Sequence, residues 1–221
     1  MVFILVSIII SYNSSSFKLF PKYPPFYAMS PPRALILGHS FVRRLSSFLS
    51  PSNIYCHNLG LQEVAEIALF GVGGWTVTKV EKFDLSFVRA WKPDIVILEL
   101  GTNDLTTFSP ESVGSSLEEL VQLLYENCSV KVIGVCQVIK RCPPPPKMLD
   151  FNSRVIRLHK YLKFVLEPLQ FCFYWRHIGF WNLSSGIYLK DGVHLNDLGL
   201  VKLYRSYRGA VLKALSTLNG A

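Results

Sequence analysis

The sequence predicts an α/β fold in which about five parallel strands form one sheet between two layers of helices. Apolar runs alternate with amphipathic stretches along the chain, which is the order of repeated βα units. The run at 95–100 is apolar and rich in β-branched residues, as expected of a strand buried on both faces. The strands are expected near 34–38, 67–70, 95–100, 131–137 and 169–174.

The amphipathic stretches between these runs predict the helices. Apolar residues recur at helical spacing over 41–49, and Pro51 ends this helix. The sequence Ser109-Pro110-Glu111 starts another helix, because it combines a cap, a first-turn proline and an acid near the helix dipole. Further helices are expected around 77–91, 155–165 and 198–218. Between the regular elements we expect a short extended piece at 53–58, a proline-rich loop without helix at 141–146 and an irregular segment at 177–190.

Composition limits the class of protein. The 221 residues are 50% hydrophobic and 17% charged, which suits one well-buried domain and excludes a disordered tail or a coiled coil. The five cysteines show neither disulfide nor metal-site spacing, so no disulfide framework and no cysteine metal site is expected, and Cys136 and Cys172 are expected in the core. The net charge is +8, but the sequence contains no long basic run and no specific nucleic-acid motif. This distribution favours a solvated basic surface.

The N-terminal segment is set apart from the predicted fold. Residues 1–10 are apolar except Ser7, and they are too few to span a bilayer. They could form a signal-peptide core, with Ser14–Ser16 as cleavage residues, but no Lys or Arg precedes them, which favours a cytoplasmic location over secretion. Residues 18–32 are rich in proline and indicate a linker. We therefore expect one folded domain at 33–221, and we expect deletion of residues 1–30 to leave thermal stability unchanged.

Small polar residues and glycines collect where the predicted strands end. Ser40 follows the first strand, Gly74 the second and Asn103 the third, and the pair Asp191 and His194 follows the fifth. The carboxyl ends of parallel strands share one edge of the sheet, where α/β proteins bind their ligands. A serine at a strand-to-helix junction has two explanations, because it can cap the helix or act as a nucleophile at the positive end of the helix dipole.

This set contains the parts that acyl transfer by a serine requires. Ser40 offers the hydroxyl and His194 the base, and Asp191 lies one helical turn before His194, close enough to hold the ring. The backbone N–H groups of Ser40 and Gly74, with the Asn103 side-chain amide, could form an oxyanion hole. We predict a His194 ring nitrogen within hydrogen-bond reach of Ser40 Oγ and the Asp191 carboxylate on the other ring nitrogen. The Asn103 amide is expected to point at the space above Ser40.

The remaining motifs in the sequence do not indicate a different reaction. The glycines at 71–74 lack the lysine of a phosphate-binding loop, and Val42 replaces the second glycine of a GxSxG nucleophile elbow. Three further histidines have no partner at a helpful spacing and are interpreted as ordinary surface or core residues: His57, His159 and His177. Three aromatic residues precede the histidine block and are interpreted as core or as a wall for an acyl or sugar group: Trp175, Trp181 and Tyr188.

Four short blocks carry a family resemblance. In their order and spacing, these blocks resemble those of the SGNH (GDSL-type) hydrolases. They are Gly38-His39-Ser40, Gly73-Gly74, Gly101-Thr102-Asn103-Asp104 and Asp191-x-x-His194. The resemblance spans residues 34–218. It implies a three-layer, flavodoxin-like α/β/α fold that acts on small-molecule acyl esters or acetylated carbohydrates without a metal or organic cofactor. It also implies that Ser40 is the nucleophile, His194 the base and Asp191 its partner, with Gly74 and Asn103 as oxyanion donors.

Two positions depart from the family pattern. His39 stands where the family usually has Asp before the nucleophile, and Trp75 stands where Asp often follows the glycine pair. Two functions therefore stay open. The complete catalytic set favours a serine esterase. His39 favours a catalytically silent binding module of the same fold, since a histidine beside Ser40 could alter the local hydrogen bonding. A Gly-His-Ser block also resembles that of esterase-type domains of animal mobile-element proteins.

Overall fold

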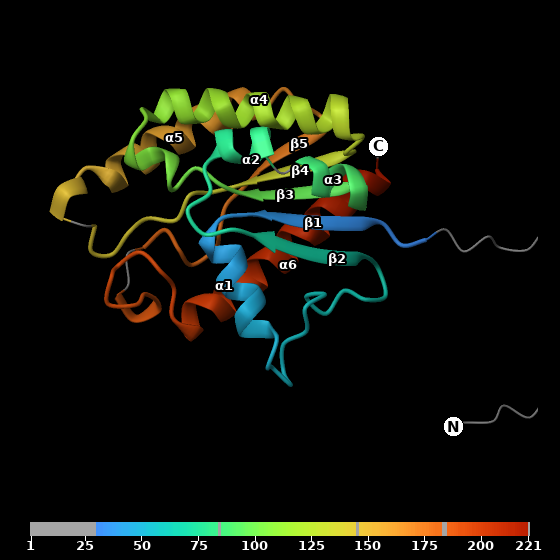
Figure 1. Ribbon diagram of the computed structural model, residues 1–221, viewed down its shortest axis with the longest axis horizontal. Helices are drawn as coiled ribbons and strands as arrows, with labels where there is room; N and C mark the ends of the chain where they lie inside the picture. Colours follow the sequence, from blue (N-terminus) through green and yellow to red (C-terminus); the bar gives the residue numbers. More distant parts are fainter. Residues whose placement is uncertain (1–29, 84, 145, 183–184, 221) are drawn as a thin grey trace, which may run out of the picture. The chain divides into compact units, whose positions relative to one another are not determined.

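The computed structural model describes residues 30–83, 85–144, 146–182 and 185–220 (Figure 1). The expectations for the N-terminal apolar segment and for deletion of residues 1–30 fall almost entirely outside these residues. Among the described residues, none of the helices combines the length and the apolar character needed to cross a membrane.

The sheet has the predicted five strands, all parallel, in the spatial order β2-β1-β3-β4-β5. The chain moves outward from β1 to β2 and then crosses back to β3 on the other side of β1. The ends of β1 and β3 therefore form the switch point at which such sheets bind ligands. The strands are β1 (Arg33–Gly38), β2 (Glu66–Gly71), β3 (Ile95–Glu99), β4 (Val132–Cys136) and β5 (Cys172–Trp175).

Helices cover both faces of this sheet (Figure 1). Leu35 and Leu37 pack with the helices of one face, whereas Ala34 and Ile36 pack with α1 and α6 on the other, as the alternation of side chains along a strand requires. The α-helices are α1 (Ser40–Leu49), α2 (Val77–Phe83), α3 (Leu85–Trp91), α4 (Pro110–Cys128), α5 (Phe151–Leu166) and α6 (Asp197–Asn219). The described residues also form the short 3-10 helices η1 (Asp104–Thr106), η2 (Pro146–Met148) and η3 (Ser185–Ile187).

Some expected elements differ in the structure. The extended piece predicted at 53–58 is wrong, because these residues form bends and turns in which the Ser52 hydroxyl accepts hydrogen bonds from the backbone of Ile54 and Tyr55. The fifth strand starts at Cys172 rather than near 169, because Leu169 takes part in a turn that follows α5. The stretch 77–91 forms two helices rather than one.

Residues 141–144 of the proline-rich loop form no helix, as predicted, but the last residue of the loop begins a short helical turn. Pro146 opens η2, and a proline is tolerated there because the first residue of a helical turn needs no N–H donor. Two other expectations are confirmed. The Ser109 hydroxyl accepts a hydrogen bond from the Ser112 backbone at the start of α4. Cys136 and Cys172 are buried, and all five cysteines are free.

Candidate active site

Ser40 is the first residue of α1, and only His39 separates it from the carboxyl end of β1. The backbone N–H of His39 donates to the Glu99 carbonyl at 3.2 Å, which holds this junction against the end of β3. A side chain at Gly38 would lie 2.5 Å from the same carbonyl oxygen, so this close approach requires glycine. Ser40 itself is half-buried. The fold therefore places the predicted nucleophile at the switch point of the sheet.

Asp191 and His194 form the pair that the sequence predicted. Asp191 Oδ2 lies 2.7 Å from His194 Nδ1, and Asp191 Oδ1 accepts the backbone N–H groups of Val193 and His194, both at 2.9 Å. The backbone is a turn closed by the carboxylate, not the helical turn expected. Partial burial raises the pKa of Asp191, but the hydrogen bonds from His194 and Val193 outweigh it and lower this pKa to about 2. The carboxylate therefore holds the Nδ1–H tautomer and leaves His194 Nε2 free to accept a proton.

The relation between His194 and Ser40 stays a prediction. Among the described residues, the hydrogen bonds of His194 go to Asp191 and Leu189, and the expected bond to Ser40 Oγ is not one of them. Such bonds often tighten only with substrate bound. The pKa of His39, the residue next to Ser40, is lowered to about 4, mainly by burial, which the attraction of Glu99 opposes in part.

The loop that carries Gly74 is tied to the 101–104 block. Asn103 Nδ2 donates to the Trp75 carbonyl at 2.7 Å, and Asp104 Oδ1 accepts the Val77 backbone N–H at 2.9 Å. Gly74 has a φ of +75°, so its backbone conformation rather than crowding favours glycine. One N–H of the Asn103 amide is thus engaged within the loop. The oxyanion role of Gly74 and Asn103 stays a prediction, and Asp104 gains a structural role that the sequence analysis left unassigned.

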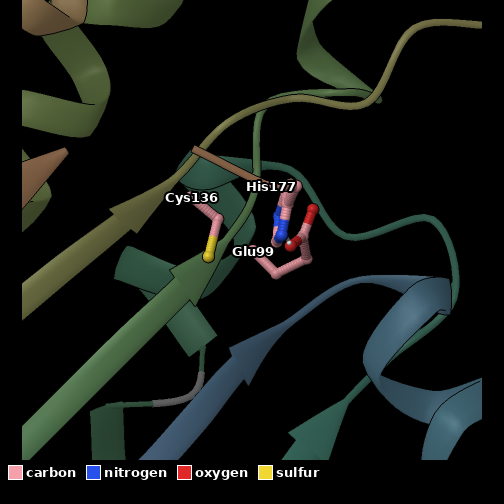
Figure 2. Close-up of side chains that lie close together, drawn as sticks. All are labelled: Glu99, Cys136 and His177. Carbon is pink, nitrogen blue, oxygen red and sulfur yellow. Dashed lines mark hydrogen bonds and ion pairs between the residues drawn. The ribbon is translucent and has the colours of Figure 1, made fainter. Parts of the chain in front are cut away.

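Below this edge lies a buried hydrogen-bond network centred on Glu99 (Figure 2). Glu99 Oε2 accepts hydrogen bonds from His177 Nε2 at 2.9 Å and from the Tyr207 hydroxyl at 3.0 Å. His177 Nδ1 shares a hydrogen bond of 2.7 Å with Ser206 Oγ, which also accepts Trp175 Nε1 at 3.0 Å. Burial raises the pKa of Glu99, but His177, His39 and Tyr207 outweigh it, so the carboxylate stays ionised with a lowered pKa. The network joins β3 and β5 to α6.

His177 is a core histidine, as interpreted, but it has a partner that its spacing did not reveal, which is Glu99. The two residues are 78 positions apart in the chain, so no short spacing could reveal the pair. One signal was available, however. Glu99 stands inside an otherwise apolar strand, and a carboxylate buried in such a strand needs a donor. The other two histidines behave as interpreted, with His57 exposed and His159 buried against the Val138 carbonyl.

His39 keeps the helix cap despite replacing an acid. Its Nδ1 accepts the Phe41 backbone N–H at 3.4 Å, which is the bond that an N-cap carboxylate would accept. The ring is therefore neutral with its proton on Nε2, which faces Glu99 Oε1 at 3.8 Å. The departure at position 39 is thus compatible with the backbone geometry at Ser40.

Glu99, Cys136 and His177 also bring three potential metal ligands within 4.8 Å of one another (Figure 2). Both ring nitrogens of His177 are already engaged in hydrogen bonds. Burial raises the pKa of the Cys136 thiol well above its usual range, whereas a metal needs the thiolate. These contacts fit a hydrogen-bond network better than a metal site.

Comparison with known proteins identifies the family. The model of the GDSL-like Lipase/Acylhydrolase family matches residues 38–200, which is more than half of the chain, so this chain belongs to that family. No curated protein matches it in sequence. A GDSL-like lipase from Bacteroides thetaiotaomicron has a similar structure, with a TM-score of 0.66 and 15% identity over 82% of this chain and 88% of that chain.

A second similar structure is a catalytic mutant of Axe2, an acetylxylan esterase from Geobacillus stearothermophilus. It has a TM-score of 0.60 and 15% identity over 83% of this chain and 94% of that chain. At such identity the structural likeness shows the fold alone, and this fold is the predicted sheet of five parallel strands flanked by helices. Family membership supports ester hydrolysis as the general class of activity.

Proposed function

We propose that this protein is a serine esterase that cleaves acetyl or acyl esters of small molecules or carbohydrates. The Asp191–His194 pair is the observation that carries the proposal. The Asp191 carboxylate holds the His194 ring and leaves its Nε2 free to accept a proton, at the sheet edge where Ser40 begins α1. Membership of the GDSL-like family supports the same reaction class. The acetylxylan esterase of similar fold favours an acetylated carbohydrate as one candidate substrate.

In this mechanism Ser40 Oγ attacks the ester carbonyl while His194 Nε2 takes the hydroxyl proton. Asp191 stabilises the imidazolium that forms, and its hydrogen bond keeps the ring oriented. The oxyanion is held by the backbone N–H groups of Ser40 and Gly74 and by the second N–H of the Asn103 amide. His194 returns the proton to the departing alcohol. Water then attacks the acyl-enzyme by the same route and releases the acid.

The test combines substrate hydrolysis with labelling of the nucleophile. The parent protein should hydrolyse p-nitrophenyl acetate, butyrate or octanoate, and a fluorophosphonate probe should label it at one serine. Ser40→Ala should abolish both, with an unchanged circular dichroism spectrum as the control for folding. If Ser40→Ala hydrolyses esters as fast as the parent, or if the folded parent is neither labelled nor active, the protein is not a serine esterase at this site. The silent binding module would then take its place.

A further inference from the structure

Arg141 is a buried cation without a counter-ion. The residue is 7% exposed, and among the described residues no carboxylate lies within ion-pair distance of it. Its guanidinium makes two long contacts, from Nη2 to the Thr102 carbonyl at 3.5 Å and from Nη1 to the Met148 sulfur at 3.9 Å. Its Nε has no hydrogen-bond partner. Buried charges in proteins are normally paired, so this side chain has an unfilled capacity to bind an anion.

The rest of the structure holds Arg141 firmly in this position. The Asn152 side chain accepts the Arg141 backbone N–H and donates to the Arg141 carbonyl, both at 2.9 Å. The guanidinium lies over the Phe151 ring at 3.9 Å from its centre. A planar cation stacked on an aromatic ring is oriented before any ligand arrives, which lowers the entropy cost of binding.

Arg141 also lies between two blocks of the candidate active site. The Thr102 carbonyl that it contacts belongs to the residue before Asn103. The backbone N–H of Cys142, the next residue, donates to the Gly192 carbonyl at 2.7 Å, inside the turn that carries Asp191 and His194. The positive charge of Arg141 also contributes to the lowered pKa of His39. The guanidinium thus contacts the 101–104 block, and the backbone directly after Arg141 is bonded to the turn of Asp191 and His194.

We infer that Arg141 binds an anionic group of the substrate, so that the ester carries a carboxylate or a phosphate on its acyl or its alcohol half. This inference rests on the proposed function and narrows its substrate class. A guanidinium presents paired N–H donors that match both anions, and such charge-assisted bonds are stronger than neutral ones. The net charge of +8 favours the approach of anionic substrates.

The test compares matched neutral and anionic esters. On the acyl half the pair is p-nitrophenyl butyrate and mono-p-nitrophenyl succinate. On the alcohol half, phenyl acetate is compared with 4-acetoxybenzoate and with 4-acetoxyphenyl phosphate, which separates carboxylate from phosphate. Each variant is scored by its ratio of kcat/KM for the anionic ester to kcat/KM for the neutral one, so that intrinsic ester reactivity cancels between proteins.

Arg141→Met should lower this ratio about 10- to 100-fold for the preferred anion, chiefly through KM, because methionine fills the space without the charge-assisted bonds. Arg141→Lys should retain an intermediate ratio, since the charge stays and the paired donors are lost. Lys140→Met removes the same charge from the neighbouring residue and should keep the ratio within about twofold of the parent. Equal losses on both esters in Arg141→Met, or a parent without preference for any anionic ester, would overturn the inference.

A binding measurement separates this inference from the esterase proposal. Calorimetry with the Ser40→Ala protein should detect monomethyl succinate or phenyl phosphate, and the additional Arg141→Met substitution should remove that binding. If the parent binds these anions through Arg141 but hydrolyses no ester, the esterase proposal fails and the inference stands. If the parent hydrolyses neutral esters and Arg141→Met leaves anion binding intact, the inference fails and the esterase proposal stands.

Discussion

Within the described part of the chain, the two shortest carboxylate–imidazole pairs have almost the same length but opposite environments. Asp191 and His194 lie 2.7 Å apart with side chains 47% and 28% exposed, whereas Glu99 and His177 lie 2.9 Å apart with side chains 1% and 0% exposed. In the exposed pair one ring nitrogen stays free for a proton. In the buried pair both nitrogens are engaged and no substrate can reach them. The surroundings, rather than the pair itself, decide which histidine can act as a base.

Replacing His194 should have the largest effect on activity. His194→Ala should lower kcat about 10⁴-fold or more, because in the proposed mechanism Ser40, His194 and Asp191 act as one unit and the loss of one member removes their concerted action. Unfolding stability should change by less than about 1 kcal/mol, since an exposed ion pair contributes little. Ester hydrolysis and urea denaturation measure the two quantities.

The matched control is His57→Ala, which removes an exposed histidine elsewhere and should leave kcat unchanged. A His194→Ala protein with parental kcat would mean that the exposed pair is not the catalytic one.

Replacing Glu99 should have its main effect on stability, in contrast to replacing His194. Glu99→Ala leaves His177 and Tyr207 without their acceptor, and breaking a buried charged network typically costs about 3–5 kcal/mol of unfolding free energy. Glu99→Gln keeps the shape and an acceptor oxygen, so it should cost less. Urea denaturation gives both values, and a loss below about 1 kcal/mol for Glu99→Ala would show that the network does not stabilise the fold.

The two pairs also differ in how far the sequence could predict them. Asp191 and His194 are three residues apart, so a single turn joins them and the pairing was predictable, although its turn type was not. His177 meets Glu99 only after β3 and the segment after β5 reach the same edge of the sheet. The strands were predictable because each is a short apolar run with a clear end. The pairing within the buried network depends on how α6 packs on the sheet, which periodicity alone does not specify.

Asn103→Ala should lower kcat about 10²- to 10³-fold while the protein stays folded, because removal of one oxyanion donor has this typical effect. The Asn103 side chain also donates to the Trp75 carbonyl, so loss of loop anchoring must be separated from loss of the donor. Asp104→Asn weakens the other anchor of that loop, the bond to the Val77 backbone. An equal loss of kcat in both variants would assign Asn103 to anchoring rather than to oxyanion binding.

The pH dependence of stability should separate buried from exposed groups, with a smaller effect than the substitutions above. Burial lowers the pKa of both His39 and His159 from 6.5 to about 4. Between these values the unfolded chain binds protons that the folded chain does not, so unfolding free energy should fall as pH drops from about 6.5 to about 4 and then level off for these groups. Above pH 6.5 they should contribute no slope.

The exposed pair should affect stability at lower pH than the two buried histidines do. The pKa of Asp191 is lowered from 3.8 to about 2, so its stabilising effect is present above pH 3.8 and is lost as pH falls toward 2. Solvent screening keeps that effect small for a half-exposed carboxylate. Urea midpoints measured from pH 7 to pH 2.5 test both windows. His159→Gln should flatten the slope between pH 6.5 and 4. Asp191→Asn should lower stability by a small constant amount above about pH 4 and should change the slope only below that pH. A His159→Gln curve parallel to that of the parent over the upper window would show that His159 is not held neutral by burial.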